Sequence, residues 1–157
     1  MKYPLTLRVL FTYILLYLSV NGDNLIIPVL ILLFGDLVDV VVISDSKQFV
    51  KTFDYHRYDK IADIISYVIF LLMYRHMIDG HIIQLLWAFV VYRLIGVIKF
   101  YNEYDTKYLK LFPDFINSTL VIYAMSKYID INTDVFIPIG CIYKILVEQR
   151  MHNQQYN

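Results

Sequence analysis

The sequence has few of the residues that mark disulfide-bonded domains or glycine-rich nucleotide loops. Its 157 residues include one cysteine, five glycines and four prolines. The single cysteine, Cys141, excludes an internal disulfide, and we interpret it as a small core residue. We find no phosphate-binding glycine loop, no Ser/His/Asp triad and no Cys/His pair. Because the net charge is zero, no global positive field favours nucleic acid as a partner.

Apolar residues are abundant, at 59% of the chain, with a mean hydropathy of +0.54. A membrane-spanning helix needs about 20 mostly apolar residues. The apolar runs predict an all-α, polytopic integral membrane protein in which residues 1–157 form a single membrane domain. A signal peptide is the alternative for the first helix, which we expect to stay uncleaved. We expect six transmembrane helices, at about residues 5–20, 25–43, 59–76, 82–100, 113–128 and 133–149.

The basic residues predict the orientation of these helices. With both termini cytoplasmic, only Arg75 and Lys127 fall on the outer side, and Arg93 falls within the fourth helix. This asymmetry is what the excess of Lys and Arg in cytoplasmic segments predicts. Eleven basic residues then lie on the inner side: Lys2, Arg8, Lys47, Lys51, Arg57, Lys60, Lys99, Lys107, Lys110, Lys144 and Arg150.

Four aspartates lie within or beside the second and third apolar runs. Asp36 and Asp39 are three residues apart, and Asp59 and Asp63 are four apart, so each pair shares one helix face. The predicted topology places both pairs near the cytoplasmic surface. Clustered carboxylates repel one another and attract cations, and their oxygen atoms favour Mg²⁺ or Mn²⁺. The sequence therefore predicts a divalent metal site; the alternative is that these acids only cap helices and contact solvent.

The same stretches resemble the signature of the CDP-alcohol phosphatidyltransferases. The segment DLVD, a basic linker and YDKIAD are similar to D-x-x-D-G-x-x-A-R followed by G-x-x-x-D-x-x-x-D, and PLTLRVL resembles the start of the family's first helix. The resemblance covers roughly residues 4–75. The sequence departs from the signature at Val40, Ile43, Ser44 and Tyr55, and the gap from Asp39 to Asp59 is two residues longer.

This resemblance implies a metal-dependent enzyme of phospholipid synthesis whose active site faces the cytoplasm. Asp36, Asp39 and Asp59 would bind two divalent ions, Mg²⁺ or Mn²⁺, and Asp63 would be a shared ligand or the catalytic base. The enzyme would move a phosphoalcohol group from a CDP-linked alcohol or lipid to an acceptor hydroxyl and release CMP. We expect the substrate phosphates to be bound by the basic residues Lys47, Lys51 and Arg93.

The sequence also allows other functions. The missing signature glycines and arginine favour a non-catalytic six-helix membrane protein that has lost nucleotide binding. For Arg93, the alternative is an extended side chain that reaches the lipid headgroups. A cation carrier is disfavoured because the outer halves of the predicted helices are almost wholly apolar. The partners that we expect are the lipid bilayer and the CDP-linked substrate, and a homodimer is one option for the oligomeric state.

Overall fold

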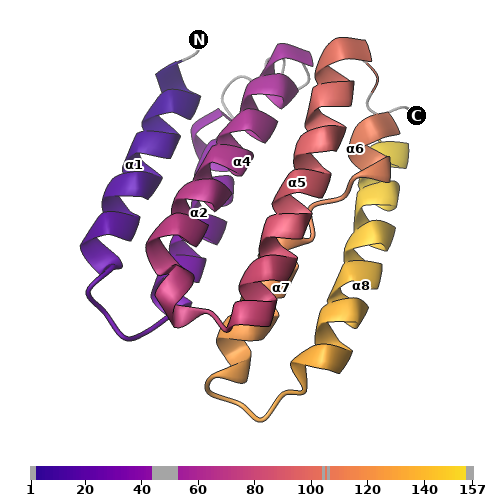
Figure 1. Cartoon of the computed structure of the whole chain (residues 1–157). Helices are drawn as coiled ribbons and strands as arrows, with labels where there is room; N and C mark the ends of the chain where they lie inside the picture. Colours follow the sequence, from indigo (N-terminus) through magenta and orange to yellow (C-terminus); the bar gives the residue numbers. More distant parts are fainter. Residues whose placement is uncertain (1–2, 44–52, 104, 106, 155–157) are drawn as a thin grey trace. The chain divides into compact units, whose positions relative to one another are not determined.

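The structure, a computed structural model, describes residues 3–43, 53–103, 105 and 107–154, and its regular elements in these ranges are all helical (Figure 1). This confirms the all-α prediction for the described part of the chain. The elements are α1 (Tyr3–Ser19), α2 (Ile26–Ile43), α4 (Phe53–Tyr74), η2 (Arg75–Met77), α5 (Gly80–Glu103), α6 (Lys107–Leu111), α7 (Ile116–Ser126) and α8 (Thr133–Gln154).

Each of the six predicted helices corresponds to an α-helix of the structure, but some of the bounds differ. Helix α4 begins at Phe53 instead of residue 59, because no proline or glycine interrupts the polar stretch before its apolar part. Helix α7 has 11 residues, fewer than the predicted 113–128, since residues 112–115, between α6 and α7, are not helical. Apolar runs thus locate these helices better than they locate their ends.

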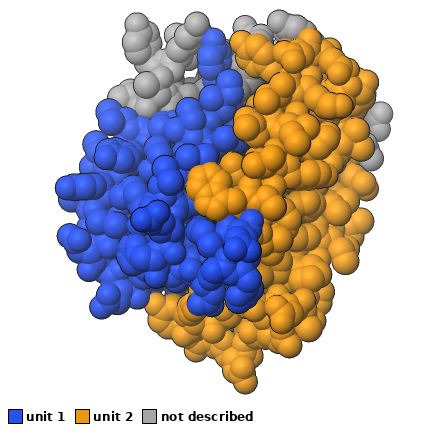
Figure 2. Space-filling model, viewed as in Figure 1, with its two compact units in different colours: residues 1–84 blue, residues 85–157 orange. Residues whose placement is uncertain are grey.

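The chain divides into two compact units, residues 1–84 and 85–157, which Figure 2 colours separately. The first unit holds α1, α2, α4 and η2, together with the first residues of α5. The second holds the rest of α5 with α6, α7 and α8. The prediction of one membrane domain stays a prediction.

In the first unit, α1 packs against both α2 and α4. Leu16, Phe70, Leu71 and Tyr74 are fully buried, and the rings of Phe70 and Tyr74 stack with their centroids 5.0 Å apart. The Tyr74 hydroxyl donates to the carbonyl oxygen of Leu16 at 2.6 Å and lies 2.6 Å from the Ser19 Oγ. These bonds join the C-terminal ends of α1 and α4.

In the second unit, α7 and α6 pack against α8. Gly140 permits a close approach of α8 to α7, because a Cβ added there would lie 2.6 Å from the Ile122 Cδ1. On α5, the Tyr92 ring packs on the segment after α6, with its centroid 4.8 Å from that of Phe112 and 5.9 Å from that of Phe115. Aromatic contacts therefore hold the α6–α7 connection against α5.

One of the described helices, Gly80–Glu103, is long and apolar enough to cross a membrane by length and composition. Shorter apolar helices are Arg8–Ser19 and Ile26–Gly35. Helix α7, with 11 residues, extends about 17 Å at 1.5 Å per residue, short of the roughly 30 Å hydrocarbon core of a bilayer.

Candidate metal and substrate site

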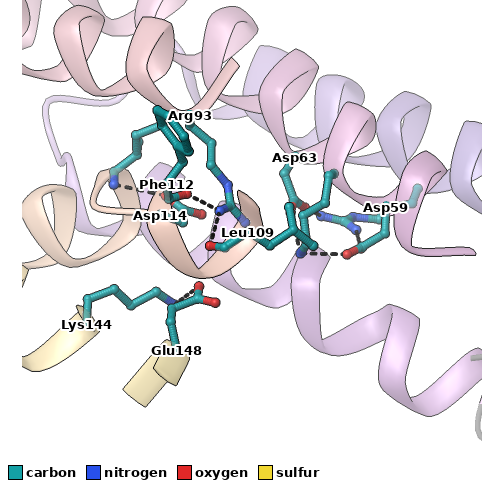
Figure 3. A network of polar contacts seen from close by, with 11 residues as sticks. Asp59, Asp63, Arg93, Leu109, Phe112, Asp114, Lys144 and Glu148 are labelled. Atoms are coloured by element: carbon teal, nitrogen blue, oxygen red, sulfur yellow. Dashed lines mark hydrogen bonds and ion pairs between the residues drawn. The ribbon is translucent and has the colours of Figure 1, made fainter. Parts of the chain in front are cut away.

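A buried arginine, Arg8, joins α1 to both predicted site acids of α4. Figure 3 labels the two acids, Asp59 and Asp63. The Arg8 Nη1 donates to the Asp59 Oδ1 at 3.0 Å, and its Nη2 donates to the Asp63 Oδ1 at 2.6 Å. Because residues four apart lie on one helix face, a single guanidinium reaches both carboxylates. The predicted common face of Asp59 and Asp63 is therefore found in the structure.

Lys60 contacts the other oxygen atom of each carboxylate. Its Nζ lies 2.7 Å from the Asp59 Oδ2 and 3.1 Å from the Asp63 Oδ2. Each of the four carboxylate oxygens of Asp59 and Asp63 thus faces a cationic nitrogen, and two positive charges balance two negative ones. We call these four residues, Arg8, Asp59, Lys60 and Asp63, the charge cluster.

The charge cluster is mostly withdrawn from solvent. The side chain of Arg8 is 4% exposed and that of Asp63 is 8% exposed, whereas Lys60 retains 23%. Buried charges are tolerated when they are paired and hydrogen-bonded, and removing one partner is costly because it leaves an uncompensated charge. The pairing therefore explains how Asp63 remains buried.

The second helix approaches the charge cluster at Gly35, which is buried. A Cβ added to Gly35 would lie 3.1 Å from the Thr12 Oγ1 and 3.8 Å from the Arg8 Nε. The backbone of α2 therefore passes close to Arg8 one residue before Asp36. Asp36 and Asp39 follow Gly35 within α2, but their side chains lie outside the described part of the chain.

Of the three predicted substrate-binding cations, the structure describes Arg93 alone. Lys47 and Lys51 lie outside the described residues. Arg93 belongs to α5 and is 2% exposed. Its Nη1 donates to the carbonyl oxygens of Leu109, at 3.3 Å, and of Phe112 (Figure 3). In the second unit, Arg93 thus binds the end of α6 and the residue after it.

Two buried acids of the second unit were missed in the sequence analysis. The Asp114 Oδ1 accepts a hydrogen bond at 3.0 Å from the backbone N–H of Ile116, the first residue of α7. An aspartate just before a helix is a recognisable start signal, so Asp114 could have been found. Glu148 of α8 is 6% exposed, and its Oε1 lies 3.5 Å from the Lys144 Nζ. The spacing of four residues was the available signal.

The connection from α5 to α6 carries exposed charged and aromatic groups. The Lys107 Nζ lies 2.8 Å from the Asp105 Oδ2 and 4.9 Å from the centre of the Tyr108 ring. The hydrogen bond from Lys107 holds the pKa of Asp105 below its ordinary value, and the same contact raises the pKa of Lys107. The Tyr108 hydroxyl donates to Glu103, and this hydrogen bond raises the pKa of Tyr108.

The donor chemistry of the charge cluster fits a hard divalent cation. Asp59 and Asp63 offer only oxygen atoms, and an ionised carboxylate has about four lone-pair sites, more than the two cationic contacts occupy. Among the residues that the structure describes, no group of three or more His, Cys, Asp and Glu residues is placed to hold a metal. Asp59 and Asp63 would hold a metal only if it replaced at least one of their contacts with Arg8 and Lys60.

Comparisons of this chain with protein families, with curated proteins and with solved structures give no match.

Proposed function

We propose that the chain is an integral membrane protein with six helices in the bilayer and both termini in the cytoplasm. Large apolar side chains are exposed on several helices, with Phe34 66%, Leu18 71% and Tyr143 67% exposed. Large exposed apolar patches favour contact with a membrane or a partner, and the inner excess of basic residues favours the membrane. On helix α8, six large apolar side chains are exposed: Val135, Phe136, Ile139, Ile142, Tyr143 and Leu146.

The activity that we propose is transfer of a phosphoalcohol group from a CDP-linked alcohol, with release of CMP. One observation carries this proposal: the helices that hold the three family-like segments, α1, α2 and α4, pack together in one compact unit. Arg8 of PLTLR contacts Asp59 and Asp63 of YDKIAD across 51 and 55 residues of sequence. Gly35, which begins GDLVD, lies against Arg8. These contacts favour a shared site for Asp59 and Asp63 over two unrelated surface acids.

In the proposed reaction, the acceptor hydroxyl oxygen forms a bond to the phosphorus atom that carries the alcohol, and the bond from that phosphorus to CMP breaks. The Asp63 carboxylate takes the proton of the acceptor, which requires hydrogen-bond contact with that hydroxyl. Asp36, Asp39 and Asp59 would hold Mg²⁺ or Mn²⁺, with Asp63 as a shared ligand. Bound divalent ions would neutralise the diphosphate and the charge on departing CMP.

A non-catalytic membrane protein is the second candidate, and the charge cluster itself favours it. Arg8 and Lys60 already face every carboxylate oxygen of Asp59 and Asp63. A buried ion-pair cluster of this kind can fix the packing of two helices without any chemistry. The departures from the signature at Val40, Ile43 and Ser44 point in the same direction.

The experiment that separates the two candidates is an assay of CMP release by the purified protein in lipid vesicles. CDP-diacylglycerol, Mg²⁺ or Mn²⁺, and a panel of acceptor alcohols are supplied. We expect release that requires both a divalent ion and one acceptor of the panel, and that acceptor identifies the product. Folded protein that releases no CMP with any acceptor would favour the non-catalytic candidate.

A further inference from the structure

We infer that Arg8 and Lys60 are built-in counter-cations that compete with a divalent ion for Asp59 and Asp63. The inference rests on the proposed function for the identity of the competing ion. It adds that the charge cluster has two states: one in which the protein supplies the cations, and one in which a divalent ion takes over at least one of their contacts.

Every carboxylate oxygen of Asp59 and Asp63 already contacts a cationic nitrogen. The four nitrogen–oxygen contacts measure 3.0, 2.6, 2.7 and 3.1 Å, one to each oxygen of Asp59 and Asp63. Mg²⁺ binds oxygen at about 2.0–2.1 Å and demands near-ideal geometry. An ion on these oxygens would lie close to the ammonium and guanidinium groups, and like charges in a poorly solvated site repel strongly. Binding of the ion therefore requires Lys60 or Arg8 to move.

The two cations are not equally easy to displace. Lys60 lies on the same helix as both acids, and its side chain is 23% exposed, so its ammonium group can turn towards water. Arg8 comes from α1, is 4% exposed, and also packs near Gly35 of α2. Because Arg8 joins different helices, its departure would disturb their packing. We infer that Lys60 gives way first.

The test measures binding of Mn²⁺ alone to the full-length protein in detergent micelles, by electron paramagnetic resonance of the free ion. Lys60→Gln removes one competing charge and leaves Arg8 in place. We expect this variant to bind Mn²⁺ about tenfold more tightly than the unsubstituted protein, because a charge-assisted hydrogen bond is worth about one decade in an equilibrium constant. Lys107→Gln is the matched control, since Lys107 pairs with Asp105 in the exposed connection after α5.

A second variant, Arg8→Gln, separates competition from a purely structural role. We expect it to unfold at a lower temperature without metal, since it leaves buried carboxylates short of a partner, and to bind Mn²⁺ more tightly than the unsubstituted protein. If Arg8 were purely structural, its loss would lower both the unfolding temperature and the affinity for Mn²⁺. If Arg8→Gln does not fold, Lys60→Gln alone decides the question.

Equal Mn²⁺ affinity in the unsubstituted protein and in Lys60→Gln would overturn the inference, as would equal tightening in Lys107→Gln. Absence of Mn²⁺ binding in every form would also overturn it. The assay is separate from catalysis. Tighter Mn²⁺ binding in Lys60→Gln without any CMP release would support the role of Arg8 and Lys60 as counter-cations and reject the transferase. CMP release with the same Mn²⁺ affinity in Lys60→Gln and the unsubstituted protein would support the transferase and reject the counter-cations.

Discussion

At Gly96, the absence of a side chain allows α5 to meet the segment after α6. A Cβ added there would lie 2.3 Å from the Phe112 Cβ and 2.7 Å from its Cγ. These atoms are close to the backbone, so rotation of the phenyl ring cannot relieve the clash. The same segment supplies the Phe112 carbonyl that Arg93 binds. One small residue therefore affects both the packing and the hydrogen bonding of this segment.

We predict that Gly96→Ala lowers the free energy of unfolding by about 1–3 kcal/mol, the usual cost of inserting a methyl group into a packed site. Equilibrium unfolding in detergent micelles measures the change. Gly80→Ala is the control, because nothing lies within 4 Å of an added Cβ there. We expect that variant to be neutral or to gain up to about 1 kcal/mol from helix propensity. Equal losses in both variants would contradict the close contact with Phe112.

The contact between Lys107 and Asp105 predicts a pH dependence with two limits. Because the folded pKa of Asp105 is lowered, its contribution to stability is present above its unfolded pKa and is lost as the pH falls through the folded value. Because the folded pKa of Lys107 is raised, its contribution is present below its unfolded pKa and is lost as the pH rises through the folded value. The contact therefore contributes fully at neutral pH.

We expect Lys107→Gln to raise the pKa of Asp105 towards its ordinary value, since the hydrogen bond from the ammonium group is the main cause of the shift. A carbon-13 titration of the Asp105 carboxyl group measures this pKa. Lys127→Gln serves as the comparison. It removes the same charge at another place, because Lys127 lies over the Tyr123 ring. An unchanged pKa of Asp105 in Lys107→Gln would show that the contact does not persist in solution.

At the scale of elements, Arg93 connects α5 to the end of α6. Its guanidinium donates to two backbone carbonyls, those of Leu109 and Phe112. The last carbonyl groups of a helix have no partner within the helix, so a buried cation there satisfies and stabilises them. This contact gives Arg93 a structural role in addition to the substrate-binding role that we predicted from the sequence.

We predict that Arg93→Gln lowers the free energy of unfolding by about 1.5–3 kcal/mol, the range for hydrogen bonds to charged groups. The measurement is denaturant unfolding in micelles, with exposed Lys99 changed to Gln as the control, for which we expect about 0.5 kcal/mol or less. An unchanged unfolding midpoint together with a raised KM for the CDP-linked substrate would instead favour substrate binding by Arg93.

The sequence predicted the helices and the common face of Asp59 and Asp63, because both follow from local periodicity. It did not predict that Arg8 pairs with them. The chain has 14 lysines and arginines, and the choice among them depends on how α1 packs against α4, which spacing along the sequence does not encode. The short α6 and the late start of α7 were also missed, since no apolar run marks these boundaries.

At the scale of the whole molecule, we propose a membrane protein with the charge cluster near the cytoplasmic surface. Apolar side chains exposed on α1, α2, α4, α5 and α8 favour lipid as the surrounding medium. Charges that are buried within helices of this kind are costly and usually functional. The charge cluster, with Arg8 and Asp63 both buried, fits that expectation.

The most direct test of the proposed transferase compares two buried acids for metal-dependent CMP release in lipid vesicles. Asp63→Asn removes the proposed base, and Asp114→Asn changes a buried acid of the second unit whose Oδ1 accepts a hydrogen bond from the backbone N–H of Ile116. We predict a loss of about 100-fold or more for Asp63→Asn, the usual contribution of a general base, and near-normal release for Asp114→Asn. Equal CMP release by Asp63→Asn and the unsubstituted protein would contradict the proposed role of Asp63 and, with it, the proposed transferase.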